Sequence, residues 1–288
     1  MTDISKEYIN NLMPARSADA NKYSVGSLLC VCGSYSMAGA AALCAKAALR
    51  SGAGYVRCAV PKSIYPIVAT LVPEAVFLVL EETAEGVISQ KEAGKIIKAA
   101  KKTDAVVFGC GSRLSADTES LALSLLMENE TPLLLDADGI NAVSKHIDIL
   151  KQRKCPVVLT PHEGELSRLT GVPSSIIKAN REQCAESFAK EYGCTLLLKG
   201  KDSLVVSGDE IFRNTTGNAG MAVAGSGDVL SGMIGSFMAQ GLSTAEAAVA
   251  GAYLHGLAGD IAKEDLTEFS LMPSDIIEYI PDAIKSVI

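Results

Sequence analysis

Short apolar runs alternate with longer segments in which apolar residues recur at helical spacing through much of the chain. Six of these runs are continuously apolar and are bounded by Gly, Pro or Asp, which is typical of strands buried on both faces of a sheet. They cover residues 27–32, 54–60, 75–80, 105–109, 132–136 and 156–160. We expect each of these strands to lie near the centre of the sheet.

The segments between these runs are rich in helix formers at helical spacing. They cover residues 39–51, 89–102, 116–129 and 138–146. Strands that alternate with helices are typical of βαβ units and a mostly parallel sheet, so the predicted fold class is α/β, with helices on both faces.

The last third of the chain follows a different pattern. Three close-set strands at 195–199, 204–207 and 210–213 are separated by polar turns, which predicts an antiparallel meander at one side of the sheet. Two helices rich in small residues follow, at 225–240 and 243–261. No repeat or Pro/Ser-rich linker divides the chain, so we expect a single domain over residues 1–288.

The composition and net charge of the chain exclude some classes of binding partner. Of the 288 residues, 48% are hydrophobic and 20% charged, as in soluble globular proteins. The formal net charge is −7, so no global positive field attracts nucleic acid or an anionic membrane. Any phosphate group would therefore have to be bound locally.

The eight cysteines are scattered, with no C-x-x-C pair and no Cys/His cluster at zinc spacing. We interpret them as buried, reduced thiols. The first 20 residues do not resemble a secretory signal, and no apolar stretch is long enough to span a membrane. These features indicate a cytoplasmic protein.

The most informative segment runs from residue 218 to residue 233. Gly225, Ser226 and Gly227 form a predicted turn that opens a helix, where free backbone N–H groups and the helix dipole favour an anion. Asp228 falls in the first turn of that helix and could take a proton from a substrate hydroxyl. An ordinary glycine turn with an Asp cap explains the same residues.

Other polar residues stand at strand ends, where α/β sheets bind ligands. His162 follows one strand, either as a helix cap or as a site residue, and Asp136 and Asp138 follow another, either as turn residues or as groups that orient a hydroxyl or hydrated Mg²⁺. The two remaining histidines, His146 and His255, are interpreted as surface or packing residues.

Two further turns are candidates for ligand contact. Lys199 and Gly200 end a strand in a way that suits a nucleotide or a simple charged hairpin, and small residues around Ala40 leave the backbone open after the first strand. The commoner phosphate motifs are missing: there is no P-loop, and Leu114 occupies the place of the third glycine of a G-x-G-x-x-G motif.

Taken together and in order, these segments resemble the ADP/ATP-dependent NAD(P)H-hydrate dehydratases of the ribokinase-like superfamily. The resemblance extends from Tyr23 almost to the end of the chain. It is carried most specifically by Thr-Pro-His-x-Gly-Glu at 160–165, Lys-Gly at 199–200 and Gly-Ser-Gly-Asp at 225–228. It implies a ribokinase-like three-layer α/β/α sandwich that repairs NADH or NADPH hydrated on the nicotinamide ring.

The resemblance also implies residue roles. Asp228 would be the base on the ring hydroxyl, and the Gly225, Ser226 and Gly227 turn would stabilise the transferred phosphoryl group. The AMP part of the nucleotide would contact Lys199, Gly200, Lys201, Asp202, Ser203 and Gly227, and the hydrated dinucleotide would contact Ala40, Gly111, His162 and Asp228. ADP, or ATP, would be the co-substrate, with Mg²⁺ bridging its phosphates mostly through water.

Some positions depart from the family pattern. Family members often have Gly-Pro-Gly-Leu-Gly where this chain has Gly109, Cys110, Gly111, Ser112 and Arg113. Residues 1–22 are too short for the epimerase domain of many relatives, so a separate hydrate epimerase is expected, and relatives suggest a homotetramer. Two alternatives remain at this point: a small-molecule kinase of the vitamin-precursor type, and a nucleotide-binding regulatory module without catalysis.

Overall fold

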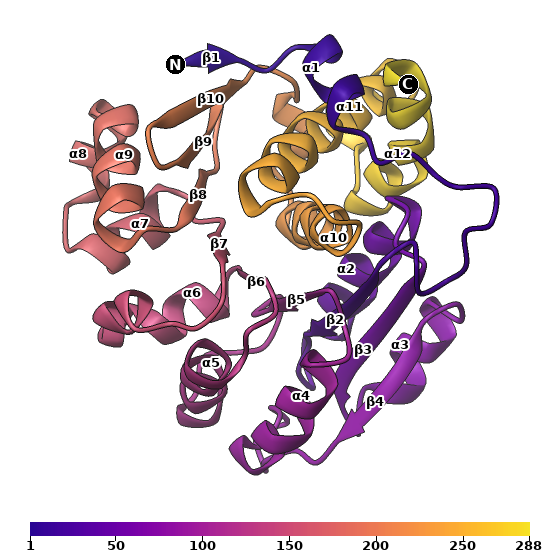
Figure 1. Cartoon of the computed structure of the whole chain (residues 1–288), viewed down its shortest axis with the longest axis vertical. Helices are drawn as coiled ribbons and strands as arrows, with labels where there is room; N and C mark the ends of the chain where they lie inside the picture. The colour runs from indigo at the N-terminus through magenta and orange to yellow at the C-terminus, as the bar shows by residue number, and fades with distance from the viewer.

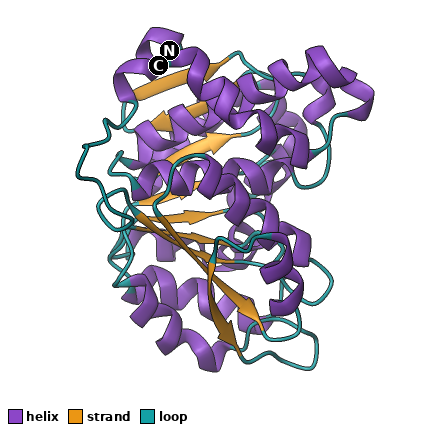
Figure 2. Ribbon diagram, turned by 90° about the vertical axis from the view of Figure 1, so that its right-hand side faces the viewer, coloured by secondary structure: helices purple, strands orange, loops and turns teal.

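The computed structural model describes all residues from Met1 to Ile288 and contains one ten-stranded sheet between two layers of helices (Figures 1 and 2). The strand order is β1-β10-β9-β8-β7-β6-β5-β2-β3-β4. The strands are β1 (Thr2–Asp3), β2 (Ser27–Val31), β3 (Tyr55–Pro61), β4 (Val76–Leu80), β5 (Ala105–Phe108), β6 (Leu133–Leu135), β7 (Val157–Leu159), β8 (Thr195–Leu198), β9 (Ser203–Ser207) and β10 (Glu210–Asn214).

The seven strands from β2 to β8 are parallel to one another, while β9 is antiparallel to both β8 and β10. Because parallel strands point the same way, their carboxyl ends meet at one edge of the sheet. The mostly parallel α/β fold and the antiparallel meander at one side are therefore confirmed. The short strand β1 adds a parallel pairing to β10.

Twelve α-helices and three short 3₁₀ helices accompany the sheet. The α-helices are α1 (Lys6–Leu12), α2 (Ala38–Arg50), α3 (Tyr65–Leu71), α4 (Ala93–Ala100), α5 (Ala116–Glu128), α6 (Asp138–Val143), α7 (Glu163–Thr170), α8 (Ser174–Ala179), α9 (Arg181–Tyr192), α10 (Ser226–Ala239), α11 (Thr244–Ser270) and α12 (Pro273–Val287). The 3₁₀ helices are η1 (Gln90–Glu92), η2 (Ser144–Lys151) and η3 (Ala219–Met221).

Two hydrophobic cores lie on the two faces of the sheet. Successive strand residues alternate between them, so that Leu28 and Cys30 of β2 belong to one core and Leu29 and Val31 to the other. Residues of α1, α2, α3, α10, α11 and α12 complete the first core, and residues of α4 to α9 complete the second. This arrangement explains why the strand sequences are continuously apolar.

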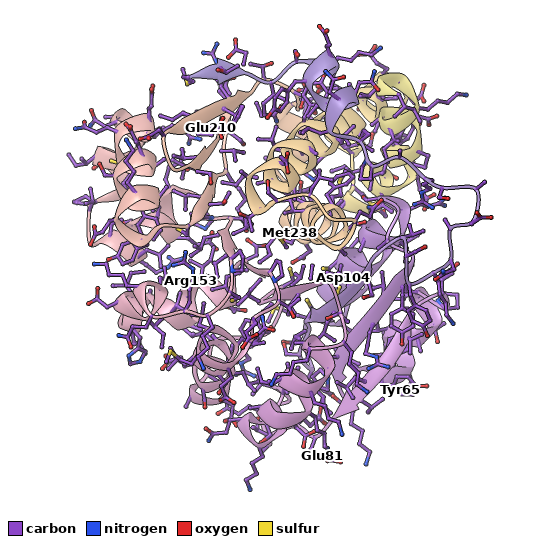
Figure 3. The ribbon with its side chains drawn as sticks, in the orientation of Figure 1. Tyr65, Glu81, Asp104, Arg153, Glu210 and Met238 are labelled. Carbon is purple, nitrogen blue, oxygen red and sulfur yellow. The ribbon has the colours of Figure 1, made fainter.

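The predicted position of one strand is wrong. β4 lies at an edge of the sheet, and Val76 and Val79 are each 40% exposed, whereas every residue of β2 is buried. Tyr65 and Glu81 mark this edge in Figure 3. The apolar run identifies the strand correctly, but its place depends on strand order, which no single segment encodes.

Helix boundaries also differ in places from the prediction. The helix expected at 138–146 ends at Val143, and η2 continues it through a non-helical residue, His146. The second of the two predicted small-residue helices, α11, extends to Ser270 instead of ending near 261, with a break in helical backbone at Thr267. No helix is long and apolar enough to cross a membrane.

Helix α10 lies at the centre of its layer, next to α2 and α11 (Figure 1). A Cβ added at Gly232 of α10 would come within 2.1 Å of the Cys44 carbonyl oxygen in α2, so glycine permits the close approach of the two helices. The same packing holds the amino-terminal end of α10 above the carboxyl ends of the central strands, beside the residues described next.

Candidate active site

The predicted turn opens α10 as expected. Gly225 caps the helix with a left-handed φ of 103°, and a Cβ there would lie 2.8 Å from the Leu43 side chain, so glycine is required on both counts. Ser226 and Gly227 follow as the first helical residues, and Asp228 stands in the first turn. The Ser226 N–H already donates to the Val223 carbonyl at 3.2 Å, so the anion-binding element consists of the other amides of this turn and the helix dipole.

A cavity of about 890 Å³ opens beside this turn. Its lining contains eight of the residues that the sequence singles out: His162, Lys199, Gly200, Lys201, Asp202, Ser203, Ser226 and Gly227. Five of them come from the turn between β8 and the start of β9, and two come from the start of α10. The proposed nucleotide residues therefore surround one volume large enough for a nucleotide.

An ion pair between Lys199 and Asp136 lies between this cavity and the ends of the strands. Lys199, directly after β8, donates to Asp136 Oδ1 at 2.8 Å, and Asp136 directly follows β6. Thr160 Oγ1, after β7, donates to the same carboxylate at 2.8 Å, and Ser231 Oγ of α10 donates at 3.0 Å. Three adjacent parallel strands thus deliver the three side chains to one point.

The electrostatics of the pair favour ionisation of both partners. Burial alone would raise the pKa of Asp136, but the Lys199 ammonium and the two hydroxyl donors hold that pKa below its ordinary value. Burial would lower the pKa of Lys199, but Asp136 and Glu165 hold it above its ordinary value. Lys199 is therefore a fixed cation at the cavity wall.

Gly227 brings the turn close to this cation. A Cβ built on Gly227 would lie 3.5 Å from Lys199 Nζ and 3.7 Å from Asp136 Oδ2. A larger side chain here would fill the space between the helix start and the ammonium group. The absence of a side chain leaves room for an anionic group to meet both the backbone amides and Lys199.

Asp228 has a different environment from Asp136. Burial, followed by the effects of Cys110 and Asp136, raises the pKa of Asp228 to about 9, and Lys199 offsets this only in part. A carboxyl group with a raised pKa, close to an anion-binding turn and a cavity, is suited to proton transfer. Two carboxylates with opposite pKa shifts thus stand side by side, one structural and one available for chemistry.

Ala40 and Gly111 lie together, next to a cysteine that is close to Asp228. A Cβ on Gly111 would be 2.6 Å from that of Ala40, and Ser34 Oγ donates to the Gly111 carbonyl at 2.8 Å. Cys110, the neighbour of Gly111, has its Sγ within 4.8 Å of a carboxylate oxygen of Asp228. Ala40, Gly111 and Asp228 therefore form one group of neighbours, while His162 stands apart from them in the cavity lining.

His162 has the capping role and also lines the cavity. Its Nδ1 accepts from the backbone N–H groups of Gly164 at 2.9 Å and Glu165 at 3.3 Å, and Glu165 returns a bond to the His162 N–H at 2.9 Å. This capping box fixes the ring at the start of α7. The capping interpretation of this histidine is therefore confirmed, while its role as a site residue stays a prediction.

His255 is the site residue that the sequence interpretation missed. It is buried in α11, lines the cavity and lies 3.3 Å from Ser226 Oγ through its Nε2. Burial lowers the pKa of His255 to about 4, so the ring is neutral near pH 7. The sequence feature that could have identified His255 is its place among small residues in a long predicted helix. His146 is exposed, as expected.

The loop before η3 also contributes to the cavity without having been assigned a contact. Asp260 of α11 accepts from the Gly217 backbone N–H at 2.8 Å and from Asn218 Nδ2 at 2.9 Å. These bonds hold residues 214–219 against the cavity, which they line. Asp260 is therefore a positioning residue for this wall.

Few side chains near Asp228 are free to coordinate a divalent cation. The carboxylates of Asp136 and Asp228 lie within 4.8 Å of each other and of Cys110 Sγ, but Asp136 is already occupied by Lys199 and two hydroxyl groups. Only Asp228 could offer an oxygen ligand without breaking the ion pair. This donor set fits a Mg²⁺ held mainly by phosphate and water, and not one held by protein ligands alone.

Two other predicted groups have structural roles. Asp138 accepts from the Arg113 backbone N–H at 2.8 Å, and Arg113 has a left-handed φ of 59° where family members often have glycine. The cysteines are free, and seven of the eight are buried while Cys184 is partly exposed. The predicted burial is confirmed for seven cysteines, but Cys32, Cys44 and Cys110 form a cluster that sequence spacing did not reveal.

Comparison with known proteins identifies the family of the chain. The family described as NAD(P)H-hydrate dehydratase matches residues 28–282. The ADP-dependent (S)-NAD(P)H-hydrate dehydratase of Neisseria meningitidis is 38% identical over 88% of this chain and 83% of its own length. The bifunctional NAD(P)H-hydrate repair enzyme of Thermofilum pendens is 38% identical over 96% of this chain and 53% of its own length.

Among solved structures, the ADP/ATP-dependent NAD(P)H-hydrate dehydratase of Bacillus subtilis, co-crystallised with ATP and Mg²⁺, superposes with a TM-score of 0.86. It is 26% identical and covers 100% of this chain and 99% of its own. This likeness confirms the ribokinase-like architecture. The chain spans about half the length of the bifunctional relatives that it matches. The match over residues 28–282 and the identity to the Neisseria protein show that the chain belongs to the NAD(P)H-hydrate dehydratase family.

Proposed function

We propose that the protein is an ADP-dependent (S)-NAD(P)H-hydrate dehydratase, a hydro-lyase that restores NADH or NADPH from the hydrated forms. The observation that carries this proposal is the position of Asp228: its carboxyl group stands in the first turn of α10, next to the Gly225–Gly227 turn and close to the Lys199–Asp136 pair. The family and the Neisseria relative support the substrate class.

The chemistry follows from these residues. Hydroxide on the nicotinamide ring is a poor leaving group, so Asp228 takes the proton of that hydroxyl as its oxygen attacks the terminal phosphorus of ADP. The bond from that phosphorus to the bridging oxygen breaks, and AMP leaves. The amides of Gly225 and Gly227, together with Lys199, stabilise the charge on the transferred phosphoryl group. The carbon–oxygen bond then breaks and the adjacent ring carbon loses a proton to the departing phosphate or to solvent, which releases inorganic phosphate and restores the double bond of the dihydronicotinamide ring.

We assign the nucleotide to the cavity and the hydrated ring to the side of Asp228 where Ala40 and Gly111 lie. Lys199, Gly200, Lys201, Asp202 and Ser203 line the cavity, which supports this assignment for the AMP part. His162 lines the same cavity, so a contact with the dinucleotide requires the substrate to extend toward α7. Mg²⁺ would be carried by the nucleotide phosphates, where it neutralises charge during phosphoryl transfer.

The finer parts of the proposal concern the setting of the enzyme. Reduced, mostly buried thiols fit work in the cytoplasm. The relative from Neisseria is named for the S form of the hydrate, so a mixture of R and S hydrates requires a separate epimerase activity. A homotetramer is proposed from the family resemblance, and light scattering on the purified protein measures that state.

A product assay tests the function. Hydrated NADH and hydrated NADPH are each incubated with ADP or ATP and Mg²⁺, while the absorbance of the reduced nicotinamide, AMP or ADP, and free phosphate are followed together. Recovery of the absorbance with one phosphate per turnover supports a dehydratase. Accumulation of a stable phosphorylated alcohol without recovery of the absorbance would identify a kinase instead, and nucleotide binding without turnover would identify a regulatory module.

A further inference from the structure

Five of the eight cysteines belong to the core on the α10 side of the sheet. Three of them converge: the Sγ atoms of Cys32, Cys44 and Cys110 all lie within 4.8 Å of one another. Cys32 directly follows β2, Cys110 closely follows β5, and Cys44 lies in α2. All three residues are fully buried, and none forms a disulfide.

The donor set of this cluster is chemically selective. The three members offer sulfur atoms only, and thiolate sulfur favours soft ions with filled d shells over Mg²⁺ or Ca²⁺. A metal–sulfur bond of about 2.3 Å places three sulfurs about 4 Å apart around a trigonal ion. The present spacing of no more than 4.8 Å therefore requires only a small contraction.

The cluster is connected to the candidate active site through Cys110. The Sγ atom of Cys110 also lies within 4.8 Å of carboxylate oxygens of Asp136 and Asp228. Asp228 is only partly buried, so an ion can approach the otherwise enclosed thiols past this carboxylate. The carboxylates give such an ion a first, weaker contact on that route.

We propose that Cys32, Cys44 and Cys110 form a binding site for a soft, thiophilic metal ion, and that its occupation inhibits the neighbouring active site. Each ligand exchanges its S–H bond for a sulfur–metal bond and releases the proton to solvent. No oxidant or reductant takes part, because sulfur and metal keep their oxidation states.

Inhibition follows from the turn that carries Cys110. Gly109 and Gly111 flank it with left-handed φ angles of 117° and 62°. A Cβ at Gly109 would lie 2.0 Å from the Asp136 carbonyl oxygen, so this turn fits closely against the strand end that carries Asp136. Movement of Cys110 toward a metal therefore moves Gly111 and the surroundings of Asp228 together.

Cadmium titration of the full chain, treated with chelator and kept reduced, tests the site. We expect a single tightly bound Cd²⁺ per chain, with thiolate-to-metal charge-transfer absorption and three sulfur neighbours by X-ray absorption spectroscopy. In Cys44→Ala, binding weakens by at least about 10-fold, because one of three ligands is lost. This variant suits the test because Cys44 lies between Leu43 and Ala45 in α2 and is not among the residues that line the cavity.

Cys194→Ala provides the matched control, because Cys194 is a buried thiol in the core on the other face. We expect it to bind Cd²⁺ as the unmodified chain does. Unchanged Cd²⁺ affinity in Cys44→Ala, or equal loss in both variants, would overturn the proposed site. Binding that follows Asp228→Asn but not Cys44→Ala would overturn it too, because the ion would then sit on the carboxylates.

The proposed inhibition of the active site is tested by a separate measurement of turnover. Nucleotide-dependent turnover should fall with a single equivalent of Cd²⁺ in the unmodified chain and in Cys194→Ala, while Cys44→Ala keeps its activity at the same concentration. Full activity of the metal-loaded chain would refute inhibition. Because binding is measured by absorption, the site can be tested even if the chain lacks dehydratase activity.

Discussion

Asp228 is subject to two opposing requirements. A base must lose its proton to act, yet burial and the neighbouring Cys110 and Asp136 raise the pKa of this carboxyl group to about 9. The ordinary value is 3.8. Between these two pH values the native state holds a proton that the unfolded state has released, so stability falls as pH rises through this window. The residue most suited to catalysis is therefore a cost to the fold at neutral pH.

Replacement of Asp228 by Asn should separate these effects. Activity falls by about 100-fold to 10,000-fold, because Asn cannot accept the hydroxyl proton. Unfolding temperature rises at pH 8, and the gain over the unmodified chain is larger at pH 8 than at pH 5, since Asn needs no proton to stay neutral. Calorimetry at both pH values measures the unfolding temperatures, and the product assay measures the activity. Near-normal turnover would disprove the assignment of the base.

His255 is expected to act on the site through Ser226. His255→Leu removes the contact to Ser226 Oγ, which leaves the first residue of α10 less firmly held and should raise KM for the nucleotide and lower kcat, together by about 10-fold in kcat/KM. His255→Gln should recover part of this loss, since its amide can replace the contact.

The His255 effect has a defined pH signature and control. Because the pKa of His255 is about 4, the ratio of variant to unmodified kcat/KM should stay constant from pH 6 to pH 9. His146→Leu is the matched control, since His146 is exposed and lies outside the cavity lining. A ratio that changes across neutral pH would show that the ring acts as a proton donor or acceptor instead.

At the scale of elements, the sequence predicted what is local. Continuous apolar runs identified strands β2 to β7, and Gly225–Gly227 identified the start of α10, because a buried strand and a glycine turn each depend on their own residues. The edge position of β4 was not predictable in this way. It depends on which strand pairs with which, and a run such as Val76–Leu80 suits either position.

The site shows the same limit. The residues of individual turns were identified, but the ion pair joins Lys199 to Asp136, 63 positions away, and His255 meets Ser226 across 29 positions. Such contacts follow from the order of strands in the sheet and from the packing of α11 on α10. The carboxyl ends of parallel strands predicted the region of the site, and only the folded chain defined its partners.

Close packing of α10 on α2 allows a test at this scale. Gly232→Ala should destabilise the protein by about 3 kcal/mol, because the added Cβ would come within 2.1 Å of the Cys44 carbonyl oxygen. Gly94→Ala in α4 is the control: nothing lies within 4 Å of its Cβ, so the change should be neutral or stabilising by up to about 1 kcal/mol. Urea unfolding of both variants measures the difference, and equal stabilities would contradict the packing argument.

At the scale of the whole molecule, the single domain remains a prediction with a physical basis. Two cores share the strands of one sheet, since alternate residues of each buried strand belong to opposite cores. Loss of either core would expose one face of the same strands. We expect one unfolding transition, with calorimetric and van't Hoff enthalpies equal. Two resolved transitions would show that the helical layers unfold independently.

The glycines of α10 also limit which substitutions this helix can accept during evolution. Gly232 meets the backbone of α2, and Gly235 would place a Cβ 2.5 Å from Val107 of β5. The helix that carries Asp228 therefore admits few substitutions along much of its length. In a saturation-mutagenesis survey, α10 should tolerate fewer replacements than an outer helix such as α9. Adaptation to new substrates would then have to come from the loops around the cavity, while the helix itself stays unchanged.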